Sequence, residues 1–213
     1  MLKNKRTALF LLAAALAAAA VLGTTLAALG ATTGQQENMF TPSENISARL
    51  SEPNWDPAEG IRLVPGKRVP KDPMVTNTSR VDEYVAIRIA FMDKDGNEMD
   101  DATLDRLLMW LDIRWNTGAG PDEWTLFEGS LGPAAQPMAF HYNSALAPGQ
   151  ASEPLFDSVR VKNEFDDPGL AEADLDFLKG LGRFSMRIEG AAVQAVGFDD
   201  AAAASGALYD LFP

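Results

Sequence analysis

Residues able to catalyse a reaction or to bind a metal tightly are scarce in this chain of 213 residues. Its single histidine, His141, lies in a Phe-His-Tyr segment, and the chain contains no His-Glu-x-x-His pattern. A catalytic zinc ion needs three converging protein ligands and an open position for water, and carboxylates alone hold zinc weakly. The absence of cysteine excludes thiolate ligands and disulfides. We therefore expect His141 to be an ordinary strand residue, and the protein to be no enzyme and to need no cofactor.

One acidic loop suggests a different metal. Asp93, Asp95 and Asn97 surround Gly96, and calcium prefers oxygen ligands in loops that contain glycine. The spacing does not fit an EF-hand, because placing Gly96 at the sixth loop position puts Phe91 at the first and an alanine at the twelfth. A turn from a strand to a helix explains the Asp-Gly pair equally well. Asp93, Asp95 and Asn97 are therefore only weak candidates for a calcium site.

The four tryptophans provide the aromatic rings that many extracellular proteins use to bind sugars. Trp55 and Trp124 lie in segments where a tryptophan more often packs into the core or against a loop. Trp110 and Trp115 flank the end of an expected helix. A monomeric glycan-binding or adhesive protein stays an alternative on these residues.

The N-terminus has the layout of an export signal. Three basic residues precede an apolar run over residues 8–21, and small residues close the segment. We expect cleavage after Ala28, which makes residues 1–28 a signal peptide and Leu29 the first residue of the mature chain. An uncleaved anchor is the rival interpretation, since residues 7–29 are long enough to span a bilayer. Either way, the pattern predicts a secreted, extracellular or cell-surface protein.

The charge of the chain limits its partners. The formal net charge is -12 at pH 7, and removing the signal takes away three basic residues and no acidic one, which leaves about -15. A surface this acidic repels phosphate backbones and anionic lipid headgroups. We therefore expect no nucleic-acid partner, and a membrane contact only through the signal segment before cleavage.

The rest of the chain alternates in the way that strands do. Apolar side chains recur at every second position from Val85 to Phe91, and Ile46, Ala48 and Leu50 point to one side. Further strands are expected at residues 124–128, 137–142, 155–162 and 183–195. Pro-Gly turns fall at residues 64–67 and 147–150. The short strands do not alternate with helices as they do in βαβ units. This order predicts one antiparallel β-sandwich over residues 45–213.

A few short helices are expected to decorate the strands. Leucines at helical spacing behind Asp100 and Asp101 predict a capped helix over residues 102–111. Residues 170–178 are expected to form a second helix that ends at Gly180, and residues 199–211 an alanine-rich third helix. The acidic pairs at 166–167 and 199–200 are expected to cap helices.

Several motifs, in this order, resemble the alternate-signal exported proteins of Gram-positive bacteria, the TasA and camelysin superfamily. The signal ends in GTTLAA at 23–28, which is similar to sites cut by the SipW-type peptidase of these systems. The other motifs are SEPNWD at 51–56, LVPG at 63–66, KDPMVTNT at 71–78, DEYV at 82–85, WTL at 124–126, YN, LAPG and PLF within 142–156, and VQA with GF within 193–198. Together they cover nearly the whole chain.

The resemblance implies a jelly-roll β-sandwich that assembles into extracellular fibres of a biofilm matrix, with copies of itself and related matrix subunits as partners. In such fibres the N-terminal arm of one subunit enters the sheet of its neighbour. Residues 29–44 would be this flexible arm, which has no proline before residue 42. Camelysin-type members have been classed as surface metallopeptidases, which stays an alternative. The residues expected to contribute main-chain hydrogen bonds or apolar contacts are Leu29, Thr33, Gln35, Met39 and Phe40.

Overall fold

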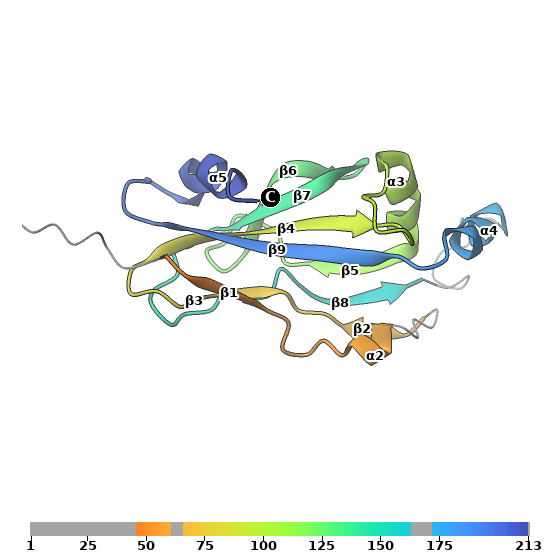
Figure 1. The fold of residues 1–213 in the computed structure, drawn as a ribbon, viewed down its shortest axis with the longest axis horizontal. Helices are drawn as coiled ribbons and strands as arrows, with labels where there is room; N and C mark the ends of the chain where they lie inside the picture. The colour runs from red at the N-terminus through yellow and green to blue at the C-terminus, as the bar shows by residue number, and fades with distance from the viewer. Residues whose placement is uncertain (1–45, 61–65, 163–171, 213) are drawn as a thin grey trace, which may run out of the picture. The chain divides into compact units, whose positions relative to one another are not determined.

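The computed structural model describes residues 46–60, 66–162 and 172–212 (Figure 1). Contacts between residues divide the chain into two units, Met1–Ser43 and Glu44–Pro213, and the described residues all belong to the second unit. The predicted signal peptide and arm lie outside the described residues. Their candidate residues are Ala28, Leu29, Thr33, Gln35, Met39 and Phe40.

A four-stranded antiparallel sheet forms one side of the unit, in the order β6-β7-β4-β9. Its strands are β6 (Trp124–Leu131), β7 (Ala134–Tyr142), β4 (Glu83–Met92) and β9 (Ser185–Gln194). β4 and β9 are paired over their full length, from Glu83 opposite Gln194 to Met92 opposite Ser185. The alternating pattern predicted for Val85 to Phe91 is thus confirmed as the centre of the largest sheet.

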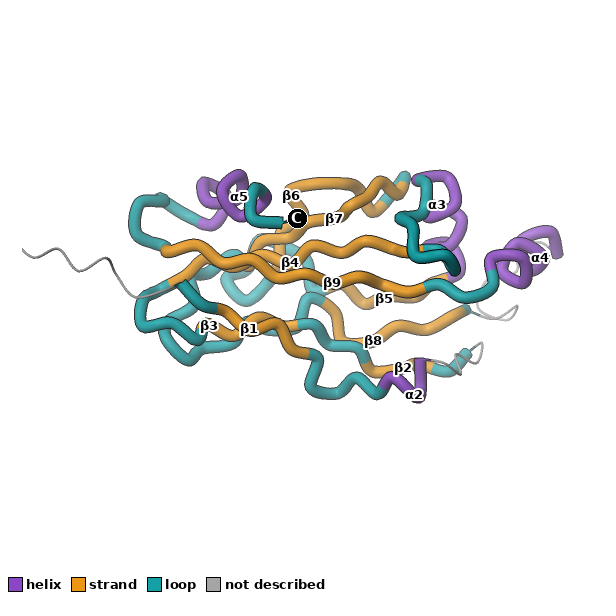
Figure 2. Tube along the Cα trace, viewed as in Figure 1, coloured by secondary structure: helices purple, strands orange, loops and turns teal. Residues whose placement is uncertain are grey.

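Two smaller antiparallel sheets complete the strands. β2 (Arg68–Pro70), β8 (Phe156–Val161) and β5 (Leu111–Trp115) form a three-stranded sheet in that order, and β1 (Ala48–Ser51) pairs with β3 (Met74–Asn77). Strands contain more of the described residues than helices do, and the helices lie at the periphery of the unit (Figure 2). The all-β, antiparallel class predicted from the sequence is confirmed.

The helices are short: α2 (Pro57–Gly60), α3 (Asp101–Trp110), α4 (Glu172–Leu181) and α5 (Ala201–Tyr209). Asp100 caps α3 by accepting a hydrogen bond from the Thr103 amide, and Asp200 caps α5 through the Ala203 amide. Both predicted caps are therefore confirmed. Among the described residues, no helix combines the length and the apolar character needed to cross a bilayer.

The helix predictions need correction at three points. α5 begins at Ala201 and ends at Tyr209, so it is shorter at both ends than the predicted range 199–211. α4 continues through Gly180 to Leu181, so this glycine does not end it; Gly182, which has a φ of 66°, follows the last helical residue instead. α3 ends one residue earlier than predicted, because Leu111 has extended backbone angles and begins β5 without a loop. The predicted start of α4 and the acidic pair at 166–167 lie outside the described residues.

The three sheets and α3 share one apolar core. Phe91 and Phe140 come from the large sheet, Phe156 from β8, and Leu104 and Leu107 from α3, and all five are fully buried. A second, smaller cluster lies on the opposite face of the large sheet, where α5 packs on β4 and β9. Its buried members are Ala86, Ala191, Ala204 and Leu208. The large sheet is therefore covered on both faces.

Gly129→Ala and Gly96→Ala form a matched pair, because both glycines have positive φ, 78° and 83°, and only one is crowded. A β-carbon at Gly129 would lie 2.6 Å from the carbonyl oxygens of Ala135 and Pro137, whereas one at Gly96 would meet nothing within 4 Å. We expect Gly96→Ala to lower the free energy of unfolding by about 1 kcal/mol through backbone strain. Gly129→Ala should lower it by at least about 2 kcal/mol. Urea unfolding measures both losses, and equal losses would contradict the packing at Gly129.

Candidate functional site

The acidic loop between β4 and α3 is held by its own hydrogen bonds. The carboxylate of Asp93 accepts one from the amide of Asp95 at 2.8 Å and one from the amide of Asn97 at 2.9 Å. The bond from the Asn97 amide lowers the pKa of Asp93. In the described part of the chain, no group of three or more acidic, histidine or cysteine side chains is arranged to hold a metal ion. The calcium site at Asp93, Asp95 and Asn97 stays a prediction.

His141 lies in β7, as predicted, with 5% of its surface exposed. Its ring stacks on Phe127 at 5.7 Å between ring centres, and its Nδ1 atom has no hydrogen-bond partner among the described residues. Burial lowers the pKa of His141, although the charge of Asp200, the cap of α5, opposes that shift. The imidazole is therefore a neutral, packed side chain and lacks the access that a zinc ligand or a general base requires.

The tryptophans mostly serve the core. Trp124 is fully buried and its indole nitrogen donates to the carbonyl oxygen of Glu153 at 2.9 Å, while Trp110 is 2% exposed. Trp115 stacks on Phe140 at 5.3 Å. The ring of Trp55 is covered by the ammonium group of Lys71, which lies 4.3 Å from the ring centre. Trp110 and Trp124 are therefore unavailable as sugar platforms.

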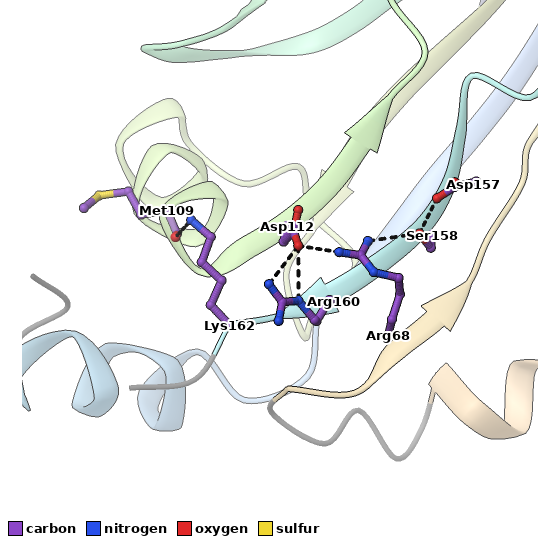
Figure 3. Close-up of polar contacts among 7 residues, drawn as sticks. All are labelled: Arg68, Met109, Asp112, Asp157, Ser158, Arg160 and Lys162. Carbon is purple, nitrogen blue, oxygen red and sulfur yellow. Dashed lines mark hydrogen bonds and ion pairs between the residues drawn. The ribbon is translucent and has the colours of Figure 1, made fainter. Parts of the chain in front are cut away.

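A polar cluster lies on the outer face of the three-stranded sheet (Figure 3). Asp112 of β5 accepts hydrogen bonds from Arg160 of β8, at 3.1 and 2.9 Å, and from Arg68 of β2. Arg68 also donates to the hydroxyl of Ser158 at 3.0 Å. Burial by itself would raise the pKa of Asp112, but the hydrogen bonds and charges of the two arginines outweigh it and lower the pKa. One carboxylate thus joins all three strands.

A groove of about 270 Å³, lined by aliphatic residues and glycine, runs between β1 and β9. β9 is paired with β4 along one edge, and no described strand pairs with its other edge. The groove lies beside this unpaired edge. Its lining residues are Ile46, Ala48, Leu50, Val75, Gly190, Ala191 and Ala192.

Small residues create this groove. Gly190 pairs with Ile87, whose side chain is in the main core, so a side chain at 190 would point between the sheets. A β-carbon at Gly190 would lie 3.5 Å from the β-carbon of Leu50, within ordinary contact distance. Gly190 and Ala192 face this side of β9 and leave this space unfilled, whereas Ala191 faces α5. The core is therefore less complete here than beneath β4.

The chain enters β1 beside a buried carboxylate. Glu83 is fully buried, and its Oε1 atom accepts a hydrogen bond from the main-chain amide of Ser47 at 3.0 Å. Its Oε2 atom has no partner in the described part of the unit. The carbonyl oxygen of Ser47 accepts from the amide of Thr78 at 2.8 Å. These bonds fix the N-terminal end of the described chain at the mouth of the groove.

Sequence reasoning found neither the groove nor its anchor. Gly190 followed by two alanines in a predicted strand was the available signal, because small residues there leave a sheet face uncovered. Glu83 had no comparable signal, since acidic residues at strand ends are normally exposed. Searches of protein-family models, of curated proteins and of solved structures found no match to this chain.

Because His141 is the only histidine, it should account for most of the change in stability between about pH 7 and 5.5. Its pKa is lower in the native protein than its ordinary value of 6.5, so the unfolded chain binds the proton more readily. The free energy of unfolding should therefore fall as the pH drops below about 6.5. His141→Leu, which is apolar and cannot titrate, should remove this slope. Urea unfolding at about pH 7.5, 6.5 and 5.5 measures it, and parallel profiles would show that His141 is not the cause.

Proposed function

We propose that this protein is a secreted structural subunit of an extracellular fibre, with a jelly-roll-like β-sandwich as its folded unit. The N-terminal arm of one subunit occupies the groove between β1 and β9 of the next and pairs with the free edge of β9. The observation that carries this proposal is the β9 edge, unpaired among the described strands, beside an unfilled groove lined by aliphatic residues and glycine. Unprotected edges of this kind attract a further strand.

The composition of the arm fits the groove. Residues 29–40 contain no proline, so every main-chain amide in this segment can donate to a neighbouring strand. Met39 and Phe40 provide the large apolar side chains that Gly190 and Ala192 lack. The large side chains of the arm and the small residues that line the groove therefore complement each other in size.

The position of the arm favours exchange between subunits. Ile46 lines the groove, and Phe40 precedes it by six residues, or at most about 20 Å of extended chain. The arm of a subunit can thus reach the mouth of its own groove or leave it for a neighbour. Filling its own groove would give a closed monomer, and sedimentation distinguishes such a monomer from a polymer.

The metallopeptidase alternative has less support. His141 is buried against Phe127 and belongs to no metal-ligand group within the described residues. Metal-dependent cleavage of casein by the wild type, lost in His141→Ala, would establish the enzyme and overturn the fibre proposal.

Processing is the first test of the proposal. If Ala28 is the last residue of the signal, the intact mass of the secreted protein should correspond to a chain that begins at Leu29. Ala28→Pro should block release, because the peptidase needs an extended chain whose main-chain N–H groups can donate hydrogen bonds. Proline has a fixed φ and no main-chain N–H group. A mature chain that starts elsewhere, or full-length protein held in the membrane, would refute the cleavage site.

Assembly is the second test. Deleting residues 29–37, or replacing Thr33 and Gln35 with proline to remove two main-chain donors, should leave a folded monomer that no longer polymerises. Ala48→Trp should also leave a folded monomer that no longer polymerises, because the tryptophan fills the groove of the acceptor subunit. Val196→Trp is the matched control, because Val196 is 79% exposed and does not line the groove.

Sedimentation and electron microscopy at matched protein and salt concentrations measure this difference, and circular dichroism checks that strand content is unchanged. Fibres should form from the wild type and Val196→Trp only. If the arm deletion and Ala48→Trp also sediment as polymers, the arm is only a tail and the groove is not its acceptor. If the wild type itself stays monomeric at every concentration, the fibre proposal fails.

A further inference from the structure

Of the two edge strands of the large sheet, β9 is the better suited to receive a further strand. β6, at the other edge, has two irregularities in its pairing with β7, one between Leu126 and Glu128 and one between Glu128 and Ser130. Such bulges turn an edge away from a new partner. β9 pairs with β4 at every position from Ser185 to Gln194, so its free edge is regular over all ten residues.

The arm has a suitable length for this edge. Residues 29–40 can extend over about 40 Å, and the ten residues of β9 extend over about 33 Å, at about 3.3 Å for each residue. An arm that lies along β9 therefore covers the strand from one end to the other. It can lie there in either of two directions, parallel or antiparallel to β9.

β1 runs in the opposite direction to β9. The chain enters β1 at the end of β9 that contains Gln194, because the amide of Ser47 donates to Glu83, which pairs with Gln194. Three residues later Leu50 lies beside Gly190, nearer the start of β9. β1 therefore starts at the Gln194 end of the groove and runs toward the start of β9.

The direction of β1 limits what a subunit can do with its own arm. Phe40 precedes the first described residue, Ile46, by six residues. Six extended residues reach at most about 20 Å, which is less than the length of β9, about 33 Å. In its own groove, the arm must therefore keep Phe40 near Gln194 and place Leu29 toward Ser185, which is the parallel direction. The arm of a neighbouring subunit has no such connection and can enter in the antiparallel direction.

We propose that the arm of a second copy of this chain lies antiparallel to β9, with Leu29 near Gln194 and Phe40 near Ser185. Every pair of strands in the three described sheets is antiparallel, and antiparallel pairing is slightly more stable per residue than parallel pairing. A subunit's own arm can form only the parallel pair, so strand direction favours exchange over self-closure. The inference rests on the proposed fibre, to which it adds the direction of the arm.

The antiparallel direction also sets how subunits follow one another. Phe40 of the arm leaves the acceptor beside Ser185, where β9 begins opposite the end of β4. The folded unit that carries this arm starts at its own Gln194 end, at most about 20 Å from Phe40. The Gln194 end of each subunit therefore faces the Ser185 end of the next. Because two different surfaces meet, the contact is head-to-tail and can repeat along a polar fibre.

Cross-linking of introduced cysteines determines the direction, because the chain contains no cysteine of its own. Ala31→Cys marks the tip of the arm and Asn38→Cys its root, while Ser185→Cys and Ala195→Cys mark the start of β9 and the residue that follows its end. All four changes keep the side chain small. The two ends of β9 lie about 33 Å apart, which exceeds the reach of a short bismaleimide.

Each arm variant is assembled with each β9 variant, so that a link between the two different chains joins two subunits. Ala31→Cys should cross-link with Ala195→Cys, and Asn38→Cys with Ser185→Cys. The other two combinations should give only background. Mass spectrometry of the linked peptides identifies each pair.

Two controls define the background and test self-closure. Glu128→Cys is the matched control for the edge, because Glu128 is exposed on β6, at the opposite edge of the same sheet. Neither arm variant should cross-link to it above the level of chance collision. A single chain that carries both Ala31→Cys and Ser185→Cys tests insertion of the arm into its own groove, and it should give no internal link.

The outcomes distinguish this inference from the fibre itself. If fibres need the arm but Ala31→Cys links to Ser185→Cys and Asn38→Cys to Ala195→Cys between chains, the arm is parallel, so this inference is wrong and the fibre proposal stands. Links to Glu128→Cys in place of β9, or to none of the marked positions, overturn the inference together with β9 as the acceptor. An internal link in a chain that stays monomeric overturns both the inference and the fibre proposal.

Discussion

The unit depends on the burial of β4 from both sides. Val85, Ile87, Ile89 and Phe91 face the main core, while Ala86 on the other face lies under α5. A strand with one solvent-exposed face would alternate between apolar and polar residues, whereas nearly every residue of β4 is buried. The outer face must therefore be covered, which makes the C-terminal helix part of the fold and not an appendage.

Burial on both faces also dictates where charges are paired. Arg88 of β4 is 8% exposed on the outer face, and its Nε atom donates to Glu189 of β9 at 2.7 Å. Its guanidinium group lies 5.2 Å from the ring centre of Phe212. A charge this deeply buried requires such partners. Asp112 makes the same kind of bond between strands of the three-stranded sheet, at a more exposed position, so a charged cross-strand link supports both of these sheets.

The sequence predicted the elements whose signals are local. The alternation along β4, the leucine spacing of α3 and the cap at Asp100 all depend on neighbouring residues, and the structure confirms them. β5 was missed because Leu111 continues the helical leucine spacing while also starting the alternation with Ile113 and Trp115. The groove depends on the close approach of Gly190 to Leu50. These two residues are far apart in the sequence, so no local pattern contains that contact.

The bond between Glu83 and the chain entering β1 has a consequence for how the sequence can vary. Glu83 binds the main-chain amide of Ser47, so any residue except proline at position 47 can make the same bond. Position 83, in contrast, needs a side-chain acceptor of this length inside a closed interior. Evolutionary change should therefore be free at the donor and restricted at the acceptor, and the N-terminal segment can diversify without loss of its anchor.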